Sequence, residues 1–382
     1  MKLVIDKAAF LKSWTLAERN VASAGGMNVL CAVRVKADEN GVELYATDVR
    51  TSIICRVQGV AVLEAGEAIF PVKGVGDLFR KAATKEFTLQ VEEGKATLVA
   101  GKSRSRFSTF PAVDFPDIPT SASASLFCKI QSKELVELLE RGTLAASQTE
   151  EFPLYLSSAW FEVQGENLKI VATDNRRLSL GLGSVQEGSQ GGALLLPMKG
   201  IKDLVRVLGV FSSETVLDIL FDDSQVYFAA EGVEFAVRRV ESRFPPYEKI
   251  LPKSASTHLV IDRLELFSAL DRLDVVVRDY NRTVVLDLKP GGDCIMTAWA
   301  PEFGRAVEEI SCSIDGDPLK IGVNSRYFME GMKVISDSMV DISFNGQDGH
   351  LAIRKVNSDD YLCLLAPVEL DKEVLEMQGD AL

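Results

Sequence analysis

Pairs of basic residues recur at one spacing in three places along the chain, and side chains of this kind contact anions such as phosphate. The pairs are Lys73 with Arg80, Lys199 with Arg206, and Arg326 with Lys333. Around each pair the apolar residues follow a helical period and form one stripe, which leaves both basic side chains on the opposite side of the helix. An ordinary solvated helix face is the alternative interpretation.

The segments that carry the first two pairs are copies of each other. FPVKGVGDLF around Lys73 matches LPMKGIKDLV around Lys199, and YATDVRTS matches VATDNRRLS at the same separation. The period is far longer than the roughly 20–50 residues of a solenoid repeat, so each copy suits a domain with its own core. The rest of the chain fits a third, fainter copy. We therefore predict domains at 1–122, 123–252 and 253–370, followed by a C-terminal tail at 371–382.

Each copy is expected to open with a short apolar strand and a helix. The three pairs of segments are KLVID with Lys7–Ser23, FCKIQ with Lys133–Ala146, and HLVID with Arg263–Val277. Alternating strands, the recurring basic helix and hairpins follow, one of them turning at Gly94. Two helices and about eight strands per copy predict an α+β fold, with the helices on antiparallel sheets.

Composition narrows the function. The chain has 382 residues, 47% hydrophobic and 25% charged, which is ordinary for a globular protein. No apolar run reaches the length of a membrane span, and the N-terminus does not resemble a signal peptide, so a cytoplasmic protein without membrane contact is expected. Six scattered cysteines and two histidines favour reduced thiols and no metal site or other cofactor.

The net charge of −13 argues against tight nucleic-acid binding, so any such contact must be local, weak or enforced by something other than charge. Phosphate-binding glycine loops, nucleophile elbows and zinc-protease motifs are missing from the sequence. A non-catalytic protein that holds a partner is the favoured interpretation. An enzyme that uses a cryptic carboxylate pair stays an alternative.

Six motifs in order resemble one known family. They are GKSRSRFSTFPAVDFPDIP, VATDNRRLS, LPMKGIKDL, SRFPPYEKILP, VNSRYFMEGM and LLAPVEL. Together they resemble the beta subunit of bacterial DNA polymerase III, the sliding-clamp family. The resemblance implies that three domains form a half-ring and that two chains join head to tail around duplex DNA. It implies that the ring tethers the replicative polymerase for processive synthesis, without a catalytic site of its own.

The resemblance also implies three sets of functional residues. Helices line the hole and contact DNA without regard to sequence through Lys12, Arg19, Lys73, Arg80, Lys199, Lys202, Arg206, Arg326 and Lys333. Polymerase, clamp loader and repair proteins insert short peptides into a pocket of Leu156, Thr173, Asn175, Arg177, Leu178, Pro245, Lys249, Ile250, Asn324, Tyr327, Leu364, Leu365, Pro367 and Val368. The homodimer interface uses Leu78, Arg104, Arg106, Phe107, Val275, Val276, Glu302, Glu308 and Glu309.

A ring is retained by topology, so weak phosphate contacts suffice and the acidic net charge is no objection. Asn175-Arg176, Ala366 and Glu369 depart from the family pattern at positions that bear on partner preference. A repeat-built scaffold that binds proteins without encircling DNA is the remaining alternative. Retention on circular but not on linear DNA distinguishes a clamp from such a scaffold.

Overall fold

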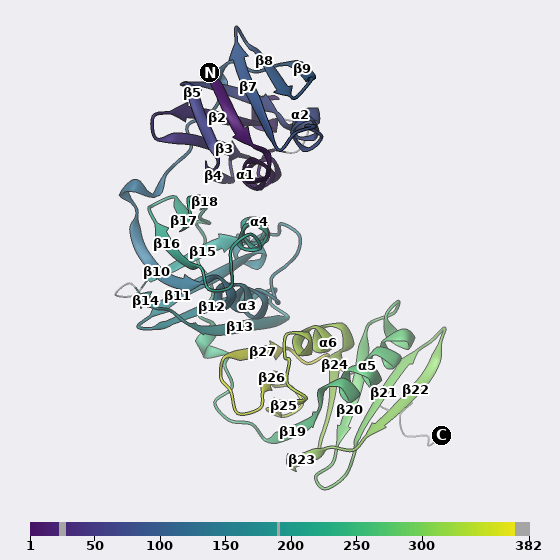
Figure 1. The fold of residues 1–382 in the computed structure, drawn as a ribbon. Helices are drawn as coiled ribbons and strands as arrows, with labels where there is room; N and C mark the ends of the chain where they lie inside the picture. Colours follow the sequence, from purple (N-terminus) through teal and green to yellow (C-terminus); the bar gives the residue numbers. More distant parts are fainter. Residues whose placement is uncertain (23–27, 189–191, 371–382) are drawn as a thin grey trace. The chain divides into compact units, whose positions relative to one another are not determined.

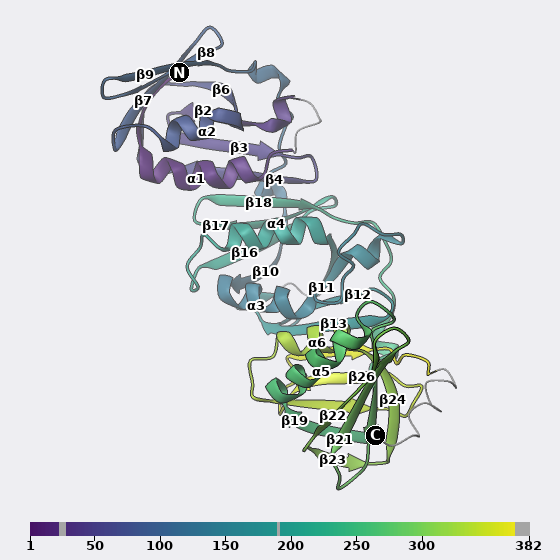
Figure 2. The ribbon, with the colours of Figure 1, turned by 90° about the vertical axis from the view of Figure 1, so that its right-hand side faces the viewer.

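The computed structural model describes residues 1–22, 28–188 and 192–370, and within them it contains six α-helices on antiparallel sheets (Figures 1 and 2). This confirms the α+β class. The predicted tail at 371–382 lies outside the described residues. The helices are α1 (Lys7–Arg19), α2 (Val72–Arg80), α3 (Ser132–Gly142), α4 (Met198–Leu208), α5 (Arg263–Val277) and α6 (Ser325–Lys333). No helix in the described part of the chain is long and apolar enough to cross a membrane.

The strands repeat with the sequence. The first copy contains β1 (Lys2–Asp6), β2 (Ala32–Asp38), β3 (Gly41–Thr47), β4 (Thr51–Val57), β5 (Val60–Glu64), β6 (Gly66–Pro71), β7 (Glu86–Glu92), β8 (Lys95–Ala100) and β9 (Ser103–Ser108). The second contains β10 (Ser125–Gln131), β11 (Ser158–Gln164), β12 (Asn167–Thr173), β13 (Arg177–Ser184), β14 (Glu187–Gly188), β15 (Gly192–Pro197), β16 (Val216–Phe221), β17 (Gln225–Ala230) and β18 (Val233–Arg238). The third contains β19 (Thr257–Asp262), β20 (Thr283–Leu288), β21 (Cys294–Ala300), β22 (Gly304–Ile310), β23 (Ser313–Gly316), β24 (Leu319–Asn324), β25 (Met339–Phe344), β26 (Leu351–Lys355) and β27 (Tyr361–Leu365).

Each copy therefore has one strand more than expected. In every copy a short strand, β5, β14 or β23, forms one edge of a sheet, where alternation is too brief to stand out in the sequence.

The described residues form two compact units, drawn from 1–133, 185–192 and 199–239 and from 134–184, 193–198 and 240–370. The first unit holds a nine-stranded sheet, β14-β10-β16-β17-β18-β4-β3-β2-β6, and a five-stranded sheet, β5-β1-β7-β8-β9. The second holds a nine-stranded sheet, β15-β11-β12-β13-β27-β26-β25-β19-β23, and a four-stranded sheet, β22-β21-β20-β24. We call the pairing of β18 with β4 the first seam and that of β13 with β27 the second seam.

Helix boundaries follow from local capping. Asp6 and Asp262, the last residues of the matching strands KLVID and HLVID, accept the backbone N–H groups of Ala9 and Glu265 at 2.8 and 2.9 Å. A carboxylate at this position satisfies a donor that the first helical turn leaves free. The hairpin at Gly94 is confirmed, with φ of 73°.

Two predicted helices are too long. α1 ends at Arg19 because the side-chain amide of Asn20 donates to the Leu16 carbonyl at 2.8 Å and closes the last turn; Ser23 lies outside the described residues. α3 ends at Gly142 rather than Ala146, because the Ser179 hydroxyl donates to the Gly142 carbonyl at 2.9 Å. The Ser179 hydroxyl oxygen in turn accepts the Ala145 N–H at 3.0 Å.

The apolar stripes of the recurring helices are confirmed with one exception. Val75, Ile201 and Phe328 are buried at matching positions. Val205, which the helical period also assigned to this stripe, is 38% exposed, because Val207 lies on the buried side of α4 in its place.

A partly buried ion pair joins α3 to the turn before β27 in the second unit. The Arg141 side chain on α3 is 8% exposed and donates to the Asp360 carboxylate, which also accepts the Lys355 ammonium at 2.6 Å. Burial by itself would raise the pKa of Asp360, but hydrogen bonds from Lys355 and Ser358 and the charge of Arg141 outweigh it and lower the pKa. Asp360 is therefore ionised in the folded protein at neutral pH.

Asp360→Asn is expected to lower the free energy of unfolding by about 2 kcal/mol at pH 7, because Arg141 loses the nearest of its carboxylate partners. Since folding lowers the pKa of Asp360, its stabilisation is present above the ordinary carboxyl pKa of about 4 and is lost as pH falls through the folded value. Thermal unfolding at pH 7 and near pH 3 measures this. The difference in unfolding temperature between the variant and the unmodified chain should be smaller at the lower pH. The exposed neighbour substitution Asp359→Asn is the control; a gap of equal size at both pH values would contradict the assignment.

Candidate functional site

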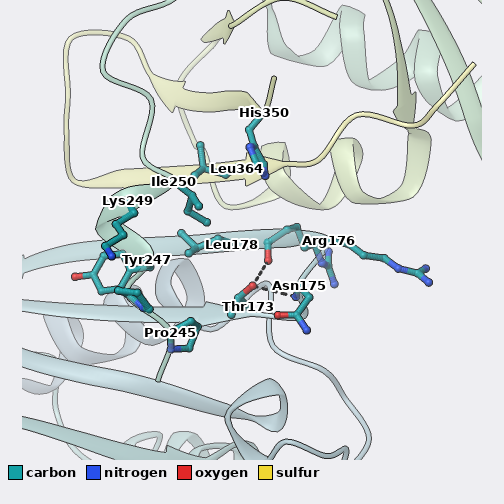
Figure 3. Close-up of a pocket in the computed structure, with 12 residues that line it drawn as sticks. Thr173, Asn175, Arg176, Leu178, Pro245, Tyr247, Lys249, Ile250, His350 and Leu364 are labelled. Atoms are coloured by element: carbon teal, nitrogen blue, oxygen red, sulfur yellow. Dashed lines mark hydrogen bonds between the residues drawn. The ribbon is translucent and has the colours of Figure 1, made fainter. Parts of the chain in front are cut away.

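A cavity of about 360 Å³ opens in the second unit beside the second seam (Figure 3). Its walls come from the end of β12 and start of β13, the loop through the short helix Tyr247–Lys249, the residue before β26, and β27. The lining residues are Thr173, Asn175, Arg176, Arg177, Leu178, Pro245, Pro246, Tyr247, Lys249, Ile250, His350 and Leu364. We call this cavity the groove.

The floor of the groove is apolar because of strand register. Leu178 on β13 lies directly opposite Leu364 on β27, and both are essentially buried, packed with Phe244 and Tyr247. Ile250 stands at the mouth, 43% exposed, and Figure 3 shows the three aliphatic side chains gathered together. An apolar side chain inserted here would gain about 1.5–3 kcal/mol from burial. The groove suits a peptide anchored by such a side chain.

A tight turn forms the polar rim. Asp174 accepts the backbone N–H groups of Arg176 and Arg177, both at 3.0 Å. The Thr173 hydroxyl accepts the Asn175 N–H at 3.1 Å and donates to the Arg177 carbonyl at 2.7 Å, as drawn in Figure 3. Asn175 adopts φ of 68°, a left-handed conformation that asparagine tolerates. The turn follows from local sequence, since short polar side chains readily bond nearby backbone.

Arg177 is held as a fixed cation at this rim. Its side chain is only 7% exposed, its Nε donates to Asp174 at 3.0 Å, and its guanidinium also bonds the Glu330 carboxylate. The guanidinium carbon lies 4.2 Å from the centre of the Tyr327 ring. Two carboxylates and an aromatic face fix its position next to the apolar floor.

Eight of the predicted pocket residues line the groove: Thr173, Asn175, Arg177, Leu178, Pro245, Lys249, Ile250 and Leu364. The six others do not line it and are Leu156, Asn324, Tyr327, Leu365, Pro367 and Val368. Several of these support the wall from behind. Asn324 caps α6, Tyr327 packs on Arg177, and Val368 donates its N–H to Gly322.

Four lining residues were absent from the predicted set. Pro246 and Tyr247 sit inside the motif SRFPPYEKILP, so continuity of that motif points to them. Arg176 adjoins Arg177, although Figure 3 shows its side chain extending away from the aliphatic floor. His350 comes from an irregular segment, and nothing in the sequence pattern connects it with the groove.

All nine predicted DNA-contacting residues are exposed on their helices, but several already carry carboxylate partners. Arg80 bonds Glu18 and Asp77, Lys199 bonds Asp48, and Arg206 bonds Asp203. A phosphate would have to compete with these carboxylates. The basic helix faces therefore favour weak, exchangeable anion contacts.

Two predicted interface segments lie on sheet edges. Exposed Arg104 and Arg106 project from β9, the last strand of the five-stranded sheet. Half-buried Phe107 packs against Phe70 and Phe79, with ring centres 6.1 and 6.5 Å away. β9 thus presents basic side chains along an edge that pairs with no strand among those the structure describes.

The other edge is acidic. Glu308 and Glu309 lie on β22, the last strand of the four-stranded sheet, and exposed Glu302 precedes it. Glu308 makes a two-pronged ion pair with Arg272 at 2.8 and 2.6 Å. On α5, Val275 is 43% exposed whereas Val276 is 7% exposed and packs in the core. The structure therefore places Val276 in the core rather than on the surface, because consecutive helical residues face different directions.

Three family models match consecutive parts of the chain: the N-terminal domain of the DNA polymerase III beta subunit over residues 1–119, its central domain over 129–246 and its C-terminal domain over 248–369. The beta sliding clamp of Pseudomonas putida is 28% identical over 372 residues, which cover 97% of this chain and all of that protein. That of Vibrio cholerae is 26% identical over 371 residues with the same coverage. The fold matches the DNA polymerase sliding clamp of Pseudomonas aeruginosa with ligand at a TM-score of 0.91 and 28% identity. It matches that of Bacillus subtilis at 0.90 and 23% identity; each structural match covers 97% of this chain and 100% of the other.

Ile250→Asp is expected to weaken binding of an apolar-anchored peptide at least tenfold, because a charge at the mouth would have to be desolvated. The exposed position should leave the unfolding temperature unchanged. Fluorescence anisotropy with a labelled peptide selected on the unmodified chain measures the affinity. The control is Val49→Asp. Val49 is exposed and lies in the turn beside the first seam, at the position that corresponds to Asn175 in the sequence repeat. Equal affinities for the two variants would show that peptides bind elsewhere.

Proposed function

The chain belongs to the DNA polymerase III beta subunit family, the beta sliding clamps, and on this premise we propose that two copies close head to tail into a ring around duplex DNA. It is a processivity subunit and carries no polymerase chemistry itself. The ring tethers the replicative polymerase, and the clamp loader and repair proteins use the same groove through short peptides. On this proposal the protein acts in the cytoplasm.

One observation carries the dimer. The first seam joins a five-stranded half-sheet, β14-β10-β16-β17-β18, to a four-stranded one, β4-β3-β2-β6. The two sheets that remain are β5-β1-β7-β8-β9 and β22-β21-β20-β24, which correspond to those two halves strand for strand in the sequence repeat. Pairing β9 of one copy with β22 of another would therefore build one more nine-stranded sheet of the same design.

Closure also answers a physical liability. An open edge strand presents unpaired backbone N–H and C=O groups that invite uncontrolled association. A head-to-tail contact that closes on itself after two copies uses both edges and leaves neither exposed. The basic β9 and the acidic surroundings of β22 favour this pairing over β9 with β9 or β22 with β22.

The basic helix faces support a sliding contact rather than tight binding. Their charges are partly neutralised by neighbouring carboxylates, and the net charge of the chain is −13. A closed ring stays on DNA by topology, so these residues need only weak contacts with phosphates, which carry no sequence information. The groove provides the second function, the tethering of partners.

Arg104→Glu combined with Arg106→Glu is expected to raise the dimer dissociation constant at least tenfold at low salt, because the basic edge would then meet an acidic one. Mixing this double variant with a second chain that carries Glu302→Lys and Glu309→Lys should restore association between the two. Sedimentation velocity measures both. A doubly reversed β9 that stays dimeric at nanomolar concentration would contradict this edge assignment.

Lys12→Glu combined with Arg19→Glu changes the net charge by the same amount as the double reversal on β9, but on α1. This variant should leave the dimer intact. It should weaken retention on nicked circular DNA and reduce the salt slope of residual binding by about one per lost phosphate contact. Gel filtration of clamp loaded on circular and on linearised plasmid measures retention. Unchanged retention and an unchanged salt slope would show that α1 does not contact DNA. Equal retention on circular and linearised plasmid would argue against a ring.

A further inference from the structure

A single carboxylate connects the groove with a predicted DNA-contacting residue. Glu330 on α6 accepts Nε of Arg326 on one oxygen at 2.8 Å and a terminal nitrogen of Arg177 on the other oxygen. Exposure changes steeply across the three residues: the side chain of Arg177 is 7% exposed, that of Glu330 23% and that of Arg326 55%. A chain of two ion pairs therefore runs from the rim of the groove to solvent on the basic face of α6.

The carboxylate is charged at neutral pH. Burial by itself would raise the pKa of Glu330, but hydrogen bonds from Arg326 and Arg177 outweigh it and lower the pKa. Together with Asp174, the four groups carry two positive and two negative charges. Because the cluster is balanced, withdrawing Arg326 would leave a net negative charge beside the groove.

The sequence repeat shows that the connection is specific to the second seam. Lys73, Lys199 and Arg326 are each followed by an acid at the same helical spacing, namely Asp77, Asp203 and Glu330. At the first seam Asp203 pairs with Lys199 at 3.6 Å and with Arg206, while Thr51 stands where the second seam has Arg177. The second seam thus combines a longer acid on the helix with an arginine on the turn, which lets them meet.

We propose that Glu330 is a positioning residue of the groove, and that it couples peptide affinity to the occupation of Arg326 by a nucleic-acid phosphate. The coupling rests on the proposed function, which places Arg326 on the DNA-facing side. When a phosphate draws Arg326 away, the Glu330 carboxylate turns wholly to Arg177. The Arg177 donors are then less available to a peptide, and the rim becomes more negative. Peptide affinity falls, and by linkage a bound peptide weakens the phosphate contact by the same factor.

The positioning role is tested by Glu330→Gln, which keeps the shape of the side chain and removes its charge. The matched control is Asp203→Asn, the acid at the same place in the preceding copy. Affinity for a labelled peptide of the replicative polymerase is measured by fluorescence anisotropy without DNA. We expect Glu330→Gln to lower the dissociation constant at least fivefold, because the Arg177 donors are released to the peptide. Asp203→Asn should change it by less than twofold, and the two variants should have similar unfolding temperatures. Equal affinities of the two variants would overturn the positioning role.

The coupling is tested by repeating the titration of the dimeric protein with a linear duplex of roughly 30 base pairs at low salt, where phosphate contacts are strongest. The duplex should weaken peptide binding severalfold in the unmodified chain. Arg326→Ala should bind the peptide weakly and show no further effect of DNA. Lys289→Ala, at an exposed lysine outside the predicted DNA-contacting set, should respond as the unmodified chain does. Arg326→Lys should restore part of the response.

The same duplex response in Arg326→Ala and Lys289→Ala would overturn the coupling. The proposed function is judged separately, by peptide binding and plasmid retention of the unmodified chain. A clamp that binds the peptide and stays on circular DNA, yet shows no difference between the matched variants, refutes this inference alone.

Discussion

Backbone pairing across the seams is the interaction on which the rest of the structure depends. At the first seam β18 and β4 align Val237 with Thr51, and at the second β13 and β27 align Leu178 with Leu364. Strand pairing fixes register residue by residue, and a slip of one position would turn every side chain to the other face. The groove floor and the position of Arg177 beside it follow from this register.

The two seams show what divergence between copies achieves. Both carry the same turn: Asp48 and Asp174 each accept two backbone N–H groups, and Val49 and Asn175 each have positive φ. At the first seam, however, Ser52 stands at the place of Leu178, and the cavity there is about 100 Å³. A shared backbone therefore supports an apolar groove at one seam and a small polar cleft at the other.

Charge placement separates structural from exchangeable interactions. Arg141 and Arg177 have side chains below 10% exposure and are bound by carboxylates, so losing a partner would leave a poorly solvated charge. Arg206 and Arg326 lie above 50% exposure, where an ion pair contributes little and a phosphate can replace it. The same kind of contact thus stabilises the fold in the interior and permits exchange on the surface.

The sequence alone predicted the repeat, because matching motifs recur in order, and it predicted the α+β class and the six α-helices, because their periodicity depends on residues close together in the chain. It also named eight residues of the groove, since the motifs that carry the family resemblance contain them. It could not place His350 in the groove, exclude Tyr327 from its lining or show that Val276 is buried and Val205 exposed. Those outcomes depend on strand register and on the rotation of each helix against its sheet. Both are fixed by packing between segments distant in sequence, and only the tertiary structure determines that packing.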